Sequence, residues 1–247
     1  MMYLSAANSW AITRKLYVYK LHALIGTFTS LVFVQLLALA LSLGGSSHSS
    51  YGLGDFSVTV DSYSTINIFG FTLIWVFFTA ITVHYKSYRD AEYSFVTNRL
   101  TSHLSNVAFL LTASAVGGLT VPLLGTLLKL IIYWTTPDTE LVMSHFTQSP
   151  IELLVGMFVT ALAASLLSSL GYVVGTLVQM NKLWILILSG LFLTLLSREH
   201  KNGILTSMVK FYSGETSLAF FSLKIVITAV ILYTFAILIS YRMEVRR

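Results

Sequence analysis

Long uncharged runs of apolar residues alternate with short polar connectors along the chain. A helix needs about 20 apolar residues to cross a hydrocarbon core ~30 Å thick, because each residue advances it by ~1.5 Å. Six runs reach or approach this length: Leu21–Leu43, Ile66–Tyr85, Leu104–Tyr133, Leu153–Met180, Leu183–Ser197 and Leu218–Tyr241. The pattern therefore predicts an all-α fold, a polytopic membrane protein with six transmembrane helices in one transmembrane domain of residues 1–247.

The segments outside these runs predict further elements. Residues 1–20 place Trp10 and Leu16 beside Arg14 and Lys15, which is typical of an N-terminal amphipathic helix on the inner leaflet. Residues 198–217 alternate polar and apolar residues without enough continuous hydrophobicity to span, so we expect a re-entrant or interfacial element between spans five and six. The connector between spans one and two contains FSVTV, whose alternation favours a short hairpin.

Composition restricts the class of protein, and the distribution of basic residues favours one orientation in the membrane. Hydrophobic residues make up 55% of the chain and charged residues 10%, which excludes an ordinary water-soluble globule. Basic residues favour cytoplasmic loops. With both termini in the cytoplasm, the inner side holds Arg14, Lys15, Lys20, Lys86, Arg89, Arg99, Lys182, Arg242, Arg246 and Arg247, and the outer side holds Arg198, Lys201 and Lys210. We therefore expect a multi-pass protein of the cell membrane with cytoplasmic N- and C-termini, in contact with lipids and not with nucleic acid.

Recognisable catalytic motifs are missing from the sequence. The phosphate-binding loop G-x-x-x-x-G-K-[ST], the H-E-x-x-H and G-x-S-x-G motifs and the dinucleotide fingerprint do not occur, and the chain has no cysteine. The six histidines are scattered through different segments: His22, His48, His84, His103, His145 and His200. We interpret them as interfacial residues, and we expect no catalytic residues, no metal and no cofactor in this chain.

Buried charge, the usual mark of an ion path, is scarce within the predicted spans. Lys129 can reach the outer interface by extending its stem, and Glu152 and Lys224 lie near span ends. Ion-coupled transport normally needs buried carboxylates or an unwound helix. It therefore has little support from these residues.

Small residues within the predicted spans favour close helix packing. The packing candidates are Gly117 and Gly118 in the third span and Gly171 and Gly175 in the fourth. Pro122 lies in the third span, where the missing N–H and the bulk of the ring should kink the helix or mark a break in it.

The connector between the second and third spans, HYKSYRDAEYSFVTNRLTSH, is the one substantial inner loop. Tyr88, Glu92 and Phe95 fall at helical spacing, so a short helix there would carry a partly apolar face beside charged residues. Two interpretations stay open at this point. The face binds a soluble partner, or the segment lies on the headgroups with its arginines on lipid phosphates.

Four features therefore occur together: an amphipathic first helix, six spans with both ends inside, an inner loop after the second span, and a semi-apolar excursion between the fifth and sixth. The stretch FVTNRLTSHLSNVAFLL leads from the inner loop into the third span. This layout resembles the type-2 ABC exporter permease family, and the stretch is similar to the short permease subunits of Gram-positive bacterial ABC exporters. The chain lacks the glycine-rich segment that usually follows the coupling loop in the drug-export branch.

The resemblance implies a set of partners and contact residues. Residues 86–103 would form a coupling loop against a separate ATPase, and Gly203–Gly214 would form the re-entrant element on the outer side. The residues that would face the ATPase are Tyr88, Arg89, Asp90, Glu92, Tyr93, Phe95, Asn98 and Arg99. Two ABC ATPase subunits would hold ATP and Mg, and a second permease, identical or paralogous, would complete a dimer.

The function implied by the resemblance is transport. The chain would be the permease subunit of an exporter that moves an amphipathic substrate outward, such as a peptide, a bacteriocin-like or other antimicrobial peptide, or a lipophilic drug. The alternative is a non-transporting immunity or sensor subunit that binds a peptide at the outer face, which the Arg198–Lys210 segment motivates. An intramembrane enzyme is disfavoured, because no carboxylate pair, Ser/Lys dyad or histidine cluster stands at productive spacing in the sequence.

Overall fold

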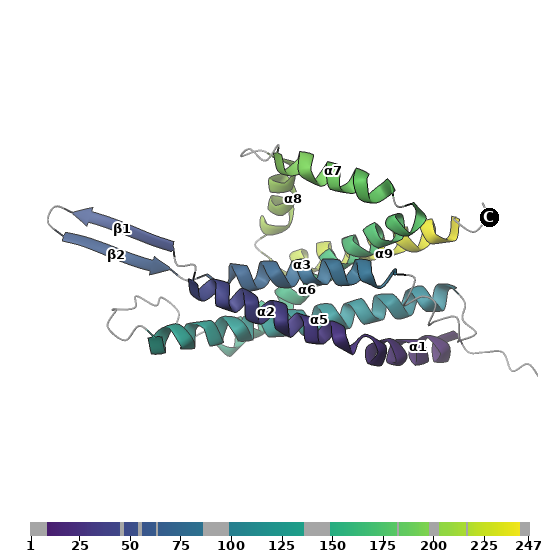
Figure 1. The fold of residues 1–247 in the computed structure, drawn as a ribbon, viewed down its shortest axis with the longest axis horizontal. Helices are drawn as coiled ribbons and strands as arrows, with labels where there is room; N and C mark the ends of the chain where they lie inside the picture. Colours follow the sequence, from purple (N-terminus) through teal and green to yellow (C-terminus); the bar gives the residue numbers. More distant parts are fainter. Residues whose placement is uncertain are drawn as a thin grey trace, which may run out of the picture.

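A computed structural model of the chain describes residues 9–44, 47–53, 56–62, 64–85, 99–135, 149–181, 183–197, 203–215 and 217–242. Within these ranges the regular structure is helical apart from one hairpin (Figure 1). The elements are α1 (Ser9–Ala23), α2 (Ile25–Gly44), β1 (Ser47–Leu53), β2 (Phe56–Ser62), α3 (Ile66–Thr82), α5 (Arg99–Thr135), α6 (Pro150–Met180), α7 (Leu183–Ser197), α8 (Ile204–Ser213) and α9 (Leu218–Arg242).

Four of these helices are long and apolar enough to cross a membrane: α2, α5, α6 and α9. α3 is apolar but has 17 residues, and α7 has 15. α5, with 37 residues, is about 55 Å long at ~1.5 Å per residue, well beyond a hydrocarbon core of ~30 Å. The chain is therefore a helical membrane protein, and the six predicted apolar runs fall on helices, the first of them across the end of α1 and α2.

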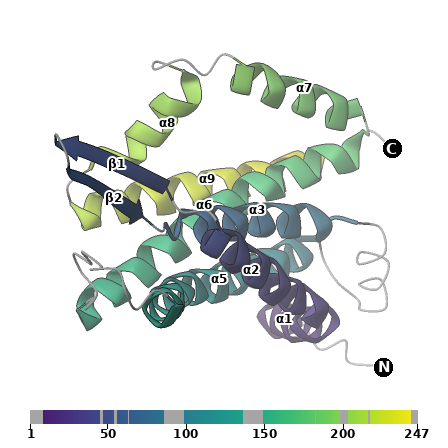
Figure 2. The same cartoon turned by 60° about the vertical axis from the view of Figure 1, so that its left-hand side comes forward.

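The long helices lie side by side along the longest axis of the molecule (Figure 1, Figure 2). α6 is in contact with α3, α5 and α9, and α5 is in contact with α1, α2 and α3. In both views α7 and α8 lie away from α2 and α5. Within the described ranges α7 contacts α6 and α8, and α8 also contacts α9.

The side chains of the bundle are arranged for a lipid solvent. Large apolar residues cover the outside, for example Phe33 on α2 and Phe235 on α9, which are 70% and 52% exposed. Hydroxyl and amide side chains are instead buried between helices, among them Gln35 and Ser168. Because lipid offers no hydrogen bonds, polar groups gain most by pairing inside the bundle.

Local signals set the ends of α6. Ser149 Oγ accepts a hydrogen bond from the Glu152 N–H at 3.2 Å, and the Ser149 N–H donates to Glu152 Oε2 at 3.3 Å, with Pro150 in the first turn. This capping box satisfies donors that the helix itself leaves unpaired. At the other end, Asn181 Oδ1 accepts from the Leu183 N–H at 3.1 Å, where α7 begins. Glu152, which the sequence placed near a span end, thus has a capping role.

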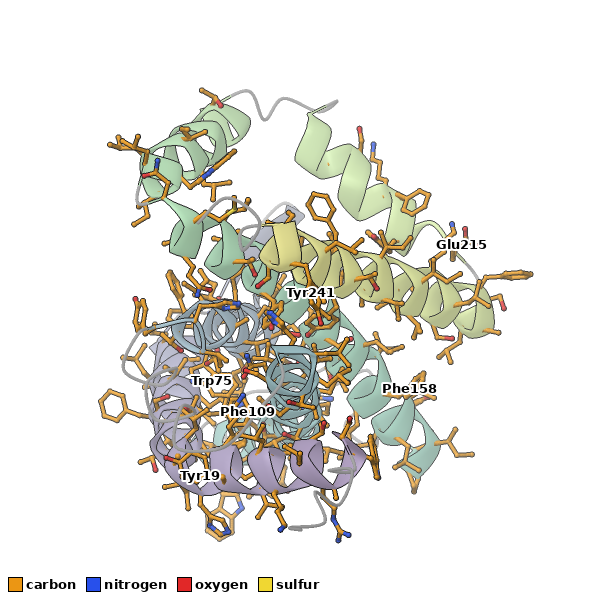
Figure 3. All side chains as sticks on the ribbon, turned by 90° about the vertical axis from the view of Figure 1, so that its right-hand side faces the viewer. Tyr19, Trp75, Phe109, Phe158, Glu215 and Tyr241 are labelled. Atoms are coloured by element: carbon orange, nitrogen blue, oxygen red, sulfur yellow. The ribbon has the colours of Figure 1, made fainter. Side chains whose placement is uncertain are left out.

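α1 differs from the expected surface helix because it packs on protein. Its buried residues, Thr13, Leu16 and Lys20, recur every three or four positions and therefore share one face. α1 contacts both α5 and α2. Leu24 separates α1 from α2 along the chain. Figure 3, viewed along the long axis, shows α1 crossing beside the other helices. The predicted first span, which began at Leu21, thus begins within α1.

Two further expectations concern the connectors. The hairpin expected from FSVTV is present, and β1 pairs antiparallel with β2 from Ser47 opposite Ser62 to Leu53 opposite Phe56. The excursion between spans five and six contains α8, which is bracketed by Gly203 and Gly214. The predicted helical fold class is therefore confirmed, and the expected two-stranded hairpin is the one sheet among the described residues.

Candidate functional site: a buried polar cluster at one end of the bundle

Polar side chains from five helical regions meet where α3 and α9 end and α5 begins, on the right in Figure 1. We call this group the polar cluster. It consists of Lys20, His84, His103, Ser105, Asn106, Tyr172, Thr176 and Ser240.

His103 joins three helices in the polar cluster. It lies in the second turn of α5, and its Nδ1 is 2.6 Å from the Tyr172 hydroxyl on α6. Its Nε2 is 3.0 Å from Ser240 Oγ on α9. Both ring nitrogens therefore have partners on other helices, and one side chain links the start of α5 to α6 and α9.

His84 joins the end of α3 to the same part of α6. Its Nδ1 donates to the Ala80 carbonyl at 3.2 Å, and its Nε2 is 3.2 Å from Thr176 Oγ1. The imidazole packs against the Tyr172 ring at a centroid distance of 4.4 Å. Gly175 makes this approach possible, because a Cβ there would lie 2.6 Å from His84 Nδ1.

Lys20 fastens α1 to the turn of α5 that carries His103. Its Nζ donates to Ser105 Oγ at 2.7 Å, to the Ser102 carbonyl at 3.3 Å and to Asn106 Oδ1. The side chain is 4% exposed, so these partners replace water around a buried ammonium group. Lys20 thus acts as a structural tie, a role that a count of basic residues cannot reveal.

Tyr172 occupies the centre of the polar cluster and is fully buried. Besides His84, its ring meets His103 at a centroid distance of 6.2 Å and Tyr233 of α9 at 5.5 Å, both edge to face. The Tyr233 hydroxyl is 2.7 Å from Ser168 Oγ. A second tie between α6 and α9 therefore lies next to the first.

A separate set of polar contacts lies further along the bundle. Gln35 Nε2 of α2 donates to Thr120 Oγ1 at 2.7 Å and to Thr72 Oγ1 at 3.2 Å. Trp75 Nε1 donates to Ser30 Oγ at 2.9 Å. Figure 3 shows Trp75 and Phe109 among the packed helices, whereas Phe158 points away from them on α6. These contacts link α2 to α3 and α5.

The four glycines that were packing candidates all lie at contacts between helices. Gly117 faces Thr72 of α3, and a Cβ on Gly118 would overlap the backbone of α6 at Ala161. Gly171 approaches α3, where a Cβ would lie 2.5 Å from the Phe77 carbonyl oxygen, and Gly175 meets the His84 ring. Close helix approach at these points allows α6 to pack in the middle of the bundle.

Pro122 does not interrupt α5, which is helical through it. A proline has no N–H, so the carbonyl four residues earlier, that of Gly118, loses its intrahelical donor. Thr160 Oγ1 of α6 donates to that carbonyl at 2.7 Å. A neighbouring hydroxyl thus replaces the missing bond, which is how prolines are accommodated in membrane helices.

The predicted ATPase-facing residues lie almost entirely outside the described ranges. This applies to Tyr88, Arg89, Asp90, Glu92, Tyr93, Phe95 and Asn98, whereas Arg99 is the first residue of α5. The chain leaves the described bundle one residue after His84, at Tyr85, and re-enters it at Arg99, four residues before His103. His84, which precedes the predicted coupling loop of residues 86–103, and His103, the last residue of that loop, therefore both belong to the polar cluster.

The segment that contains α8 is joined to α9 by a charged contact. Lys224 Nζ, in the second turn of α9, forms an ion pair with Glu215, and it lies 4.4 Å from the centroid of the Phe211 ring. Ion pairs with this much exposure contribute little alone, but the cation–π contact adds to the docking of α8. Figure 3 shows Glu215 near the start of α9, far from Tyr241.

The polar cluster joins α1, α5, α6, α9 and the end of α3 through the contacts of its side chains. Within the described part of the chain, no group of three or more His, Asp and Glu residues could hold a metal ion. His84 and His103, which the sequence interprets as interfacial residues, come together in the fold, because both lie against Tyr172. The signal that could have suggested this is the presence of polar residues inside apolar runs, which must find partners in lipid. Gln35 is also a polar residue inside an apolar run, and it too has partners on neighbouring helices.

Comparisons with protein-family models, with curated proteins and with solved structures gave no match for this chain.

Proposed function

We propose that the chain is the permease subunit of an ATP-driven exporter, in which separate ATPase subunits bind residues 86–98 and a second permease completes the substrate path. The cargo is an amphipathic compound, and a peptide is the first choice. The chain itself hydrolyses no nucleotide. In this proposal the apolar helices α3 and α7 also span the membrane, and both termini are cytoplasmic.

One observation carries the proposal. The segment with a partly apolar, charged helical pattern is anchored at both of its flanks, by His84 and His103, in a cluster that joins α3, α5, α6 and α9. A segment that only rested on lipid headgroups would not need such anchoring. A segment on which a soluble partner pushes does need it, because force applied to the segment must reach the helices.

The orientation can be tested directly, because the chain has no cysteine. Tyr85 and Trp134 are 56% and 79% exposed. Tyr85 follows α3 and Trp134 is in the last turn of α5, and these two helices end on opposite sides of the bundle (Figure 1). Single Tyr85→Cys and Trp134→Cys variants should react with a membrane-impermeant maleimide from the cytoplasmic and the outer side, respectively. Labelling of both from the same side would overturn the six-span arrangement.

The partner can be tested by co-purification with an ATPase encoded beside this chain. The variant Arg89→Glu with Phe95→Ala should reduce the amount of co-purified ATPase several-fold. A matched control, Lys210→Glu with Phe211→Ala, changes one charge and one aromatic residue at the other end of the bundle and should retain the ATPase. If both variants retain the ATPase equally, the assignment of residues 86–98 as the docking segment is wrong.

Transport is tested in inside-out vesicles that contain the complex. ATP should drive uptake of a fluorescent cationic amphipathic peptide, and vesicles with the ATPase alone should show none. The alternative function, a peptide sensor, rests on α8, which is docked against α9 by the contacts of Lys224. It predicts saturable peptide binding to right-side-out vesicles without ATP-dependent uptake.

A further inference from the structure

We infer that the polar cluster is the mechanical link between the docking segment and the helices α6 and α9, and that Tyr172 and His103 are its positioning residues. This inference rests on the proposed function. It adds the path along which a movement of residues 86–98 would reach the rest of the bundle.

The two flanks of the docking segment bind the same turn of one helix. His103 contacts the Tyr172 hydroxyl, and His84 contacts the Thr176 hydroxyl. Tyr172 and Thr176 are four residues apart on α6, and Thr176 Oγ1 also donates to the Tyr172 carbonyl at 2.9 Å. A change in the separation of the flanks therefore acts directly on this turn of α6.

The same link reaches α9 through a second contact. His103 uses its other ring nitrogen for Ser240, near the end of α9. The Tyr172 ring also packs against Tyr233, which lies about two turns before Ser240 on that helix. α6 and α9 are thus held together at the level where the docking segment enters and leaves the bundle.

Close packing leaves little room for the histidines to move independently of α6. Gly175 touches the His84 ring, and Gly171 touches the backbone and side chains of α3 one turn away. On the other side, Lys20 holds the turn of α5 that carries His103. Because packed interfaces shift between discrete arrangements and do not deform smoothly, a displaced flank moves α6 with it.

The test separates coupling from stability. Tyr172→Phe removes one hydroxyl and leaves the buried ring, so the link from His103 to α6 is lost. Tyr233→Phe is the matched control, because it keeps the ring that packs against Tyr172 and removes only a buried hydroxyl, whose partner is Ser168 and neither His84 nor His103. The measured quantities are peptide uptake per ATP hydrolysed by the complex in inside-out vesicles, ATPase co-purification, and the midpoint of thermal unfolding.

Tyr172→Phe should keep the ATPase bound but lower uptake per ATP by about 3- to 18-fold, the factor that corresponds to an interhelical hydrogen bond of ~0.6–1.7 kcal/mol. Tyr233→Phe should lower the midpoint of thermal unfolding by about as much as Tyr172→Phe does, but it should leave uptake per ATP unchanged. Ser240→Ala provides a second variant in case Tyr172→Phe does not fold, and it should lower uptake per ATP in the same direction.

The outcomes distinguish the two proposals. If the unaltered complex transports peptide and neither Tyr172→Phe nor Ser240→Ala changes uptake per ATP, the link is wrong and the proposed function stands. Equal losses in Tyr172→Phe and Tyr233→Phe also overturn the link, because they would indicate general loosening of the bundle. If the unaltered complex takes up no peptide with ATP, the proposed function fails and the link fails with it.

Discussion

The hydrogen bond between Thr160 and the Gly118 carbonyl predicts a measurable change in the free energy of unfolding when its donor is removed. Thr160→Val keeps the shape of the side chain and removes the donor 2.7 Å from that carbonyl. Pro122 cannot supply a replacement, so a buried acceptor is left without a hydrogen bond. An interhelical hydrogen bond in a membrane protein is worth ~0.6–1.7 kcal/mol, and an unsatisfied buried group costs ~1–3 kcal/mol. We therefore expect the free energy of unfolding to fall by about 1–2 kcal/mol.

A double-mutant cycle isolates this effect. Pro122→Ala restores an N–H to α5 at the position that serves the Gly118 carbonyl, so Thr160→Val should cost less than ~0.5 kcal/mol in that background. The measurement is reversible unfolding of the purified chain in mild detergent, with added SDS as the denaturant and tryptophan fluorescence as the signal. Thr126→Val is the control, since the Thr126 hydroxyl bonds within its own helix at an exposed position.

An equal cost of Thr160→Val with and without the Pro122→Ala change would refute the reasoning. It would mean that the hydroxyl stabilises α6 by itself, through its additional contacts with the Gly156 and Met157 carbonyls. A loss of stability in Thr126→Val as large as in Thr160→Val would refute it as well.

Three other changes test the packing of the bundle in the same unfolding assay or by proteolysis. Gly118→Ala should lower the free energy of unfolding by ~1–3 kcal/mol, because a methyl group there overlaps the backbone of α6. The control Gly26→Ala meets no atom within 4 Å, so the free energy of unfolding should be unchanged or higher. A larger loss in Gly26→Ala than in Gly118→Ala would contradict the close approach. Lys20→Met should speed protease cleavage within α1, because it removes the ammonium group that donates to Ser105 and Asn106 of α5 and leaves these buried groups without that donor. The exposed Lys15→Met should not, and equal cleavage rates would exclude the tie. Gln35→Leu should change the free energy of unfolding by less than ~1 kcal/mol, because the hydroxyls of its partners Thr72 and Thr120 keep acceptors in their own helices. A loss above ~2 kcal/mol would show that this reasoning is wrong.

The sequence was most informative about which segments form helices. Apolar runs predict helices well because hydrogen bonding within the segment is the main way to satisfy a backbone in lipid. The bounds of α7 agree with the predicted run, and α6 and α9 differ from theirs by a few residues at most. The break at Leu24 was missed, because the polar residues of α1 look like a membrane-surface pattern until Lys20 is seen against α5. The continuity of α5 through Pro122 depends on Thr160, a partner that lies outside its own helix.

The candidate site was harder to predict because its members are far apart in the chain. His84, His103, Tyr172 and Ser240 come from four segments, and no local spacing relates them. None of these four residues belongs to a sequence motif that would single it out. A rule that every polar residue inside an apolar run needs a partner would have identified the members, but it would not have paired them. The packing glycines carried the missing information in part, since Gly171 and Gly175 mark the face of α6 that meets α3.

Polar contacts also explain why some helices are fixed more firmly than others. In lipid, apolar surfaces gain little by meeting each other, so packing of small residues and hydrogen bonds decide which helices are neighbours. α5, α6 and α9 are joined by His103, Tyr172 and Ser168, and α2 is joined to α3 and α5 by Gln35. The ties around His84 and His103 connect α6 with α9, whereas those further along connect α2 with α3 and α5. Under the proposed function, a push on residues 86–98 would therefore act first on α6 and α9, and the Gln35 contacts would hold the other group of helices together while it does so.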